Sequence, residues 1–308
     1  MIFRSNVKVN IGLKVIGIRS DGYHNISTIF QELDCGDILK IHNKNTGFEL
    51  SSNLDSVPLN ENNTCYRAYR IIKDLFPSAI KGLSVHIEKQ IPPGTGLGAG
   101  SSNGSTLLKA IKKIYNLKIS NTELEKLSSQ FSADAPFFIN GKTQKGSGKG
   151  DVLENISRPF EGKFLMVLPN FSISTKWAFD KLKNISRPFD GKFLMVIPNF
   201  SISTKWAFDK LKNQLKKIDN DNSFESVFNT KKSNNNVKFF ENDFERIVIP
   251  TYPEIRKIKN TLTENGAIFS SLSGTGSTVF GVFNDETSAK EAELFFRNKY
   301  QTYLTNPI

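Results

Sequence analysis

A glycine-rich segment at residues 92–103 has the composition of a loop that holds phosphate. Glycines stand at positions 94, 96, 98 and 100, and Ser101, Ser102 and Asn103 follow them. Glycine reaches positive φ at no steric cost and has no side chain to keep a ligand away from the backbone. Because free N–H groups and the positive end of the dipole gather where a helix begins, such a loop ahead of a helix favours an anion.

The glycine spacing rules out two common nucleotide motifs but leaves a simpler explanation open. No Gly-Lys-Ser/Thr follows the glycines, so the segment is not a Walker A loop, and its spacing departs from the G-x-G-x-x-G of dinucleotide-binding proteins. A tight turn followed by an N-capped helix would give the same pattern. The loop alone therefore does not distinguish a turn from a phosphate site.

A lysine and an aspartate elsewhere in the chain could carry acid–base chemistry. Lys8 and Asn10 share one face of an alternating segment whose other face is apolar, and Asp134 stands two residues before Pro136. A carboxylate can take a proton from a hydroxyl, and a neighbouring ammonium favours its ionised form. In isolation, however, the polar face of the first segment could lie in solvent, and Asp134 could be the N-cap of a helix.

Hydrophobic periodicity predicts the elements that position these residues. Alternation predicts strands at residues 7–15 and 83–87, and the second of these ends just before the glycine loop. Apolar residues at helical spacing predict a helix directly after the loop. Further helices are predicted at residues 63–75 and 121–130, and a second short glycine loop at residues 274–276 precedes a strand.

Composition excludes several classes of protein. The chain has 308 residues, a net charge of +11 and 38% hydrophobic residues, which is typical of a folded protein of one or two domains. The basic residues are dispersed, so no nucleic-acid partner is expected. Two cysteines and three histidines show no metal-site spacing, and no metal ligand is assigned. Without a signal peptide or a membrane-length apolar run, we expect a cytoplasmic protein with no membrane partner.

An internal duplication needs its own explanation. Residues 155–183 are repeated as residues 184–212 with two differences, Glu161/Asp190 and Leu168/Ile197. Each copy predicts a strand, a Pro-Asn turn and a helix, and two copies are too few for a solenoid, which needs at least about three. Because two identical strands cannot occupy one place in a sheet, we expect a single copy to pack in the core. The sequence does not show which copy this is.

Taken together, the motifs of this chain resemble those of the GHMP kinases. They occur in the family's order and span nearly the whole chain, at residues 6–13, 21–24, 63–68, 91–102, 133–138 and 272–277. The run Asp-Gly-Tyr-His at residues 21–24 resembles a motif of one branch of the family. Enzymes of that branch phosphorylate the 2-hydroxyl of 4-diphosphocytidyl-2-C-methyl-D-erythritol, in the non-mevalonate route to isoprenoids. The combination is specific, although each motif alone is not.

The resemblance implies an α+β, two-domain GHMP-kinase-like fold with the active site in the cleft between the domains. We place the N-terminal domain at residues 1–150 and the C-terminal domain, which contains the duplication, at residues 151–308. The family implies an ATP-dependent phosphotransferase that requires Mg²⁺ and takes an alcohol as acceptor. Its partner would be a small cytidyl diphosphate substrate, and the protein would be a monomer or a homodimer.

The same resemblance assigns roles to individual residues. Asp134 is expected to be the general base and Lys8 its cationic partner. The nucleotide would be bound by Asn63, Lys89, Pro93, Gly94, Thr95, Gly96, Leu97, Gly98, Ala99, Gly100, Ser101, Ser102 and Asn103. The acceptor would be bound by Asn10, Tyr23, His24, Gly274, Thr275 and Gly276, together with Thr175 and Phe179 of the first copy or Thr204 and Phe208 of the second.

Two features depart from the family pattern. Gly104 stands where the family usually has alanine, at a cost of up to about 1 kcal/mol of helix propensity. The duplication is the larger departure, because the family has one such unit. Two alternatives therefore stay open: a GHMP-fold protein whose catalysis the duplication impairs, and a GHMP kinase for another small alcohol.

Overall fold

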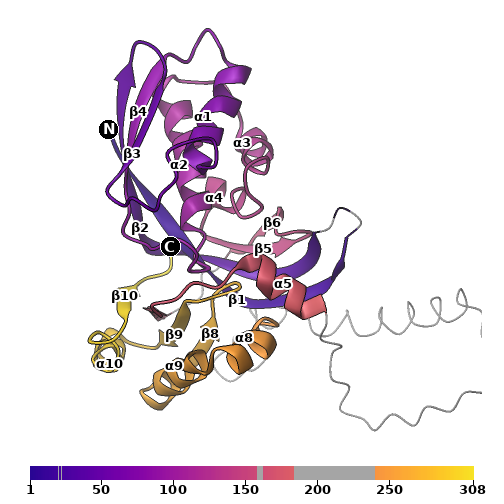
Figure 1. Ribbon diagram of the computed structural model, residues 1–308, viewed down its shortest axis with the longest axis vertical. Helices are drawn as coiled ribbons and strands as arrows, with labels where there is room; N and C mark the ends of the chain where they lie inside the picture. Colours follow the sequence, from indigo (N-terminus) through magenta and orange to yellow (C-terminus); the bar gives the residue numbers. More distant parts are fainter. Residues whose placement is uncertain (20, 22, 158–161, 184–239) are drawn as a thin grey trace, which may run out of the picture.

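The computed structural model describes residues 1–19, 21, 23–157, 162–183 and 240–308 (Figure 1). Its strands are β1 Ile2–Ile18, β2 His24–Lys44, β3 Phe48–Ser52, β4 Gly82–Glu88, β5 Thr143–Ser147, β6 Val152–Asn155, β7 Lys163–Leu168, β8 Phe269–Leu272, β9 Val279–Phe283 and β10 Gln301–Thr305. Its helices are α1 Thr64–Leu75, α2 Ala99–Ile114, α3 Asn121–Ser128, α4 Phe137–Asn140, α5 Thr175–Lys183, α8 Glu245–Thr251, α9 Pro253–Glu264 and α10 Glu286–Glu293.

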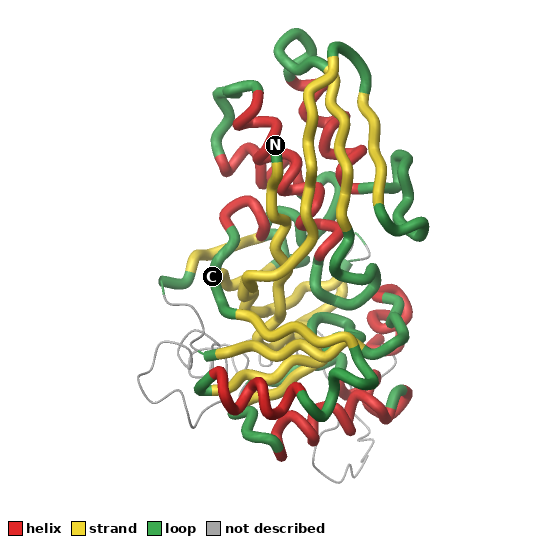
Figure 2. Tube along the Cα trace, turned by 90° about the vertical axis from the view of Figure 1, so that its left-hand side faces the viewer, coloured by secondary structure: helices red, strands yellow, loops and turns green. Residues whose placement is uncertain are grey.

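The strands form two sheets, which Figure 2 shows one above the other. The first has six strands in the order β3-β4-β2-β5-β6, with β1 paired to β2 outside that path, and the second has four in the order β10-β7-β9-β8. Within the part of the chain described here, no helix is both long and apolar enough to cross a bilayer.

Strand β1 is buried on both faces, and this places polar side chains in the interior. Val7, Val9 and Ile11 are completely buried on the face that the alternation predicts to be apolar. Lys8 and Asn10 on the other face are only 3% and 1% exposed. The alternative in which this polar face lies in solvent is therefore wrong, and the burial of an ammonium group requires polar partners close by.

Helices α1 and α2 cover one face of the first sheet and build its core. Buried residues of α2 pack with those of α1 and with strands β2 and β4, among them Leu107, Leu108, Ile111, Ala68, Ile72, Leu39 and Val85. Gly104 lies inside this contact. An alanine there would place its Cβ 2.7 Å from Cε2 of Phe131 and 3.0 Å from Cβ of Thr64. The side chains of Phe131 and Thr64 therefore already occupy the space that the methyl group of an alanine would need.

Strand β7, from the first copy of the duplication, packs against both halves of the protein. It pairs antiparallel with β9 on one side and with β10 on the other. Phe164 and Met166 pack toward β1 in one cluster, while Leu165 and Val167 pack with the helices of the second half in another. A strand buried on both faces is a continuous apolar run rather than an alternating one, which explains the sequence Phe-Leu-Met-Val.

The first copy of the duplication therefore fills the place in the core for which the two copies compete. Both edges of β7 are paired, so this position in the sheet has no room for the strand predicted from the second copy. The second copy lies outside the described residues, as do Thr204 and Phe208. The prediction that one copy packs in the core agrees with this arrangement, and that copy is residues 155–183.

The change from one sheet to the other occurs between β6 and β7. Strand β6 follows the boundary predicted at residue 150 but pairs with β5, so it belongs to the first sheet. The C-terminus returns to that sheet as well, where the backbone N–H of Ile308 donates to the carbonyl of Glu32 at 3.1 Å. The two halves are thus joined at several points rather than by one linker.

Candidate active site

A cavity of about 900 Å³ lies where the two halves meet. Its walls come from β1, the glycine loop, the start of α2, the segment around Asp134, helix α5 and the loop after β8. The predicted site residues among its lining are Lys8, Asn10, Tyr23, His24, Pro93, Gly94, Thr95, Gly96, Leu97, Gly98, Ala99, Gly100, Ser101, Asp134, Thr175, Phe179, Gly274 and Thr275. Residues far apart in the sequence thus converge on one cavity.

The glycine loop joins β4 to α2 as predicted, and its glycines adopt the backbone that the pattern implies. Gly94, Gly96 and Gly98 have φ values of +74°, +77° and +69°. Gly98 is the N-cap of α2 and no side chain caps the helix there. A Cβ on Gly98 would lie 3.0 Å from the ring of Phe138 and 3.3 Å from Cε of Lys8, so glycine is required for space as well as for φ.

The carbonyl groups of the loop bond to protein on its inner side. The carbonyl of Leu97 accepts from the backbone N–H of Lys8 at 3.0 Å. From the second half, the Ser273 hydroxyl donates to Gly96 O at 3.1 Å and the backbone N–H of Thr278 donates to Thr95 O at 3.2 Å. The first N–H groups of a helix have no intrahelical partner, and residues 99–101 line the cavity. The free N–H groups at the start of α2 can therefore bind an anion in the cavity.

Lys8 and Asp134, which both line the cavity, form an ion pair. Nζ of Lys8 lies 3.4 Å from Oδ2 of Asp134 and donates to Oδ1 of Asn10 at 2.7 Å. The Lys8 side chain is 4% exposed, whereas that of Asp134 is 36% exposed. The ammonium is therefore fixed and almost without water, while the carboxylate keeps an open side toward the cavity. Asn10 is itself held by its Nδ2, which donates to Oγ1 of Thr28 at 2.9 Å.

Asp134 is not the cap of the helix that follows it. Helix α4 has Pro136 as its N-cap, and no side chain makes a capping hydrogen bond there. The alternative of a purely structural N-cap at Asp134 is thus wrong. A carboxylate that is open to the cavity and paired to a buried ammonium can accept a proton from a bound hydroxyl.

Aromatic side chains from three distant segments also line the cavity. The rings of His24 and Phe179 are stacked with centroids 4.6 Å apart, and Phe179 meets Phe244 edge-on at 4.8 Å. Tyr23 is 53% exposed, and Nζ of Lys149 lies 5.0 Å from its ring centroid. These side chains offer flat apolar surfaces and a cation to a ligand.

The first copy of the duplication also meets the second glycine loop here. Oγ1 of Thr175 lies 3.3 Å from Oγ1 of Thr275, and Gly274 has a φ of +56°. Gly276 does not line the cavity; a Cβ there would lie 2.8 Å from Cδ1 of Ile173. Thr175 and Phe179, the first-copy members of the duplicated pairs, are therefore the ones that the described residues place in the site.

Several residues predicted to bind the nucleotide lie behind the cavity rather than on its wall. Asn63 caps α1, since its Oδ1 accepts from the backbone N–H of Cys65 at 2.8 Å. The Ser5 hydroxyl donates to that of Ser102 at 2.8 Å, and both are buried. Lys89 and Asn103 both bond to the buried carboxylate of Asp37. Their contact with a nucleotide stays a prediction.

Other residues line the cavity but were not predicted from the sequence. They include Thr64, Ser132, Lys149, Lys176 and Asp180. Lys149 lies between Gly148 and Gly150, whose φ values are +65° and +103°. A lysine between two glycines was a signal that sequence reasoning could have used, because such a turn can present the cation to a facing loop.

The side chains of the cavity are compatible with Mg²⁺ that arrives with a nucleotide. Among residues that the structure describes, no group of three or more His, Cys, Asp and Glu side chains is placed to hold a metal ion. The cavity does contain the carboxylates of Asp134 and Asp180 and the hydroxyl of Ser101. Mg²⁺ at phosphoryl-transfer sites is commonly bound by one or two carboxylates, water and substrate phosphates, and this donor set fits that requirement.

Comparison with known proteins gives matches along the whole chain. Residues 63–142 match the GHMP kinases N terminal domain, and residues 229–302 match the GHMP kinases C terminal family. A 4-diphosphocytidyl-2-C-methyl-D-erythritol kinase of Pelodictyon phaeoclathratiforme is 33% identical over 308 residues, covering 100% of this chain and 97% of the relative. A kinase of the same name from Clostridium novyi is 31% identical over 314 residues and is covered completely.

Solved structures show the same fold. A crystal structure of 4-(cytidine 5'-diphospho)-2C-methyl-D-erythritol kinase matches with a TM-score of 0.75 at 23% identity, covering 100% of this chain and 99% of that one. Mevalonate kinase from Methanococcus jannaschii matches with a TM-score of 0.67 at 16% identity, covering 100% of this chain and 98% of that one. The predicted α+β architecture is confirmed.

Proposed function

This chain belongs to the GHMP kinases, and on that premise we propose that it transfers the γ-phosphoryl group of ATP to the 2-hydroxyl of 4-diphosphocytidyl-2-C-methyl-D-erythritol. The observation that carries the proposal is the Lys8–Asp134 pair, which lines the same cavity as the glycine loop and the aromatic side chains of His24 and Phe179. The kinases to which this chain is similar supply the identity of the acceptor. We further propose a cytoplasmic enzyme that acts as a monomer or homodimer.

Asp134 would take the proton of the acceptor hydroxyl as that oxygen attacks the γ-phosphorus. A new O–P bond then forms while the bond between the γ-phosphorus and the β,γ-bridging oxygen breaks, and ADP leaves with that oxygen. The ammonium of Lys8, 3.4 Å from Asp134, would orient the carboxylate toward the acceptor and offset charge on the attacking oxygen.

The glycine loop would align the triphosphate with the acceptor. Phosphoryl transfer depends chiefly on alignment and on stabilisation of spread negative charge. The N-terminus of α2 supplies N–H groups for this purpose. Ser101 and a cavity carboxylate would hold Mg²⁺ beside the phosphates, where the ion neutralises charge on their oxygens.

The lysines of the cavity suit an acceptor that carries a diphosphate. Lys149 and Lys176 line the same cavity as Tyr23 and Phe179, and the ammonium of Lys149 lies over the ring of Tyr23. A cytosine ring needs a flat apolar surface, and a diphosphate needs cations, so both parts of the acceptor find matching chemistry here.

The proposed function predicts a strong preference among acceptors. Purified full-length protein is expected to form ADP in the presence of ATP, Mg²⁺ and 4-diphosphocytidyl-2-C-methyl-D-erythritol, with little turnover of mevalonate or homoserine. A coupled ADP assay with each acceptor measures this. Preference for mevalonate or homoserine would contradict the acceptor and leave the kinase assignment intact, whereas ATP binding without turnover of any acceptor would favour a protein impaired by its duplication.

The duplication offers a matched pair of variants for the acceptor site. Phe179→Ala is expected to raise the KM for the cytidyl acceptor roughly 5- to 150-fold, because stacking on a base is worth about 1–3 kcal/mol. Phe208→Ala, the same substitution in the second copy, is expected to leave that KM within about twofold of wild type, since Phe179 already occupies the position beside His24. Equal effects of the two substitutions on this KM would contradict the assignment of the first copy alone to the acceptor site.

A further inference from the structure

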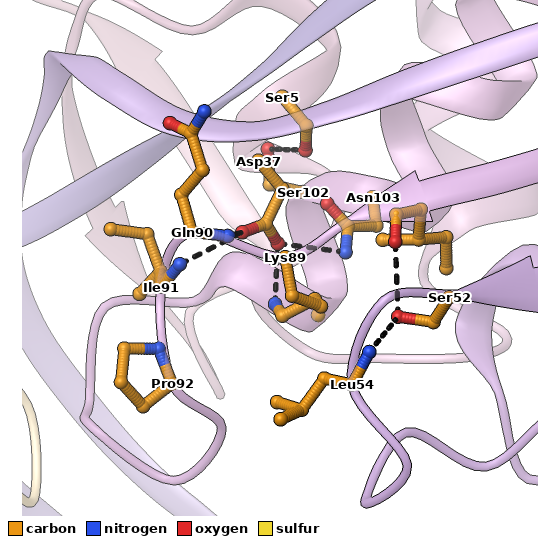
Figure 3. Close-up of polar contacts among 12 residues, drawn as sticks. Ser5, Asp37, Ser52, Leu54, Lys89, Gln90, Ile91, Pro92, Ser102 and Asn103 are labelled. Carbon is orange, nitrogen blue, oxygen red and sulfur yellow. Dashed lines mark hydrogen bonds and ion pairs between the residues drawn. The ribbon is translucent and has the colours of Figure 1, made fainter.

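One buried carboxylate, that of Asp37, holds both ends of the glycine loop. It lies on β2 and is completely buried. Its Oδ1 accepts from the backbone N–H groups of Gln90 and Ile91, each at 3.0 Å, just before the loop. Its Oδ2 accepts from Nδ2 of Asn103 at 3.0 Å, in α2 just after the loop. Figure 3 shows these bonds converging on the one side chain.

Lys89 completes the set of donors around Asp37. Its ammonium forms an ion pair with Oδ2, and the two side chains are 5% and 0% exposed. A buried carboxylate is costly unless both its charge and its lone pairs are satisfied, and here an ammonium, two backbone N–H groups and an amide satisfy them. Because the Lys89 ammonium bonds to Asp37, it does not line the cavity.

Further backbone groups of residues 89–91, here called the entrance segment, bond to Asn53, directly after β3, and to β10. Asn53 accepts from the backbone N–H of Lys89 at 2.7 Å and donates to its carbonyl at 3.2 Å. From β10, the Tyr303 hydroxyl donates to the carbonyl of Gln90. Burial raises the pKa of Tyr303 to about 12, so this hydroxyl stays protonated and remains a donor. The entrance segment is thus anchored from three sides before the loop begins.

We propose that Asp37 is a positioning residue for ATP, acting through the entrance segment and Asn103, with Lys89 as its counter-ion rather than a ligand of the nucleotide. The inference deepens the proposed function and rests on the loop being the triphosphate site. A loop whose two ends are tied to one rigid carboxylate has less freedom to lose when the phosphates bind, and preorganisation of this kind increases affinity.

Asn103→Ala tests the proposal with the smallest change, because it frees the start of α2 and leaves the Asp37–Lys89 pair intact. We expect the dissociation constant for ATP, measured by titration calorimetry well below the unfolding temperature, to rise about tenfold. The affinity for cytidine diphosphate, a probe of the acceptor end, is expected to change less than about twofold. Asp37→Asn, which places an amide where the ammonium and Asn103 donate, is expected to weaken ATP binding further.

Thr143→Val is the control for a purely structural effect. It removes a buried hydrogen bond of 2.7 Å to Gln31 in the same sheet, and neither residue lines the cavity. It is expected to lower the unfolding temperature without changing the affinity for ATP. Unchanged ATP affinity in folded Asn103→Ala, or an equal loss in Thr143→Val, would overturn the proposal, and Asn103→Ala decides alone if Asp37→Asn does not fold.

The role of Lys89 is decided by a double-variant comparison. If Lys89 acts through Asp37, the variant with both Asp37→Asn and Lys89→Met loses no more ATP affinity than the worse single variant. If its ammonium contacts the nucleotide, the two losses add and the counter-ion role is refuted. All these experiments measure ligand binding and thermal stability rather than turnover, so they remain decisive even if wild-type protein fails to phosphorylate the cytidyl acceptor.

Discussion

Replacing Asp134 with asparagine is expected to lower kcat by about 10²- to 10⁴-fold, the range that a general base contributes. Asparagine has nearly the same shape but cannot accept the proton of the acceptor hydroxyl. The ammonium of Lys8 keeps its hydrogen bond to Asn10 at 2.7 Å, so the wall of the cavity should stay in place. The affinity for ATP is therefore expected to remain within about threefold of wild type.

The comparison of kcat with nucleotide affinity distinguishes a chemical role from a structural one. Steady-state kinetics with both substrates, together with ATP titration of the variant, give the two quantities separately. If the affinity for ATP falls as far as kcat, Asp134 mainly shapes the site, and another group must take the proton. The second carboxylate of the cavity, Asp180, would then be the first candidate.

Gly98→Val is expected to act in the opposite way and to weaken ATP binding by about 100-fold or more. Residue 98 has a φ of +69°, a conformation that costs a β-branched residue about 1–3 kcal/mol. Its Cβ would lie 3.0 Å from the ring of Phe138 and 3.3 Å from Cε of Lys8, so the loop must move away from its present position. The carbonyl of Leu97, bonded to the backbone of Lys8, would move with it.

Gly47→Val is the matched control for strain in the backbone. Gly47 has a φ of +77°, but no atom lies within 4 Å of the position its Cβ would take, and it does not line the cavity. Both variants are expected to lose thermal stability, and only Gly98→Val is expected to lose ATP binding in calorimetric titration. Normal affinity in a folded Gly98→Val protein would mean that the loop does not hold the triphosphate.

The duplication shows that the partners of a strand decide which of two nearly identical segments enters a sheet. The run Phe-Leu-Met-Val occurs twice, and the two differences between the copies, Glu161/Asp190 and Leu168/Ile197, are conservative and give both copies the same predicted elements. The first copy forms β7 because its two edges pair with β9 and β10 and its two faces meet separate clusters. Those partners come from residues far along the chain, so periodicity could predict the strand and could not choose the copy.

Local sequence determined the parts of this protein whose conformation depends on near neighbours. The spacing of glycines fixed a loop with positive φ and a helix behind it, and the alternation of β1 fixed which side chains share a face with Lys8. Backbone preference and period are properties of a few adjacent residues, and they are present in the sequence itself.

Tertiary structure decided which of the residues predicted for the site line the cavity. Lys89 and Asn103 flank the glycine loop, yet both bond to Asp37, which lies 52 and 66 positions away along the chain. Lys149 lies outside the motifs that resemble the family and still lines the site. Whether a charged side chain faces a ligand or a buried partner depends on which distant residue must be neutralised, and only the folded chain brings those groups within hydrogen-bonding distance.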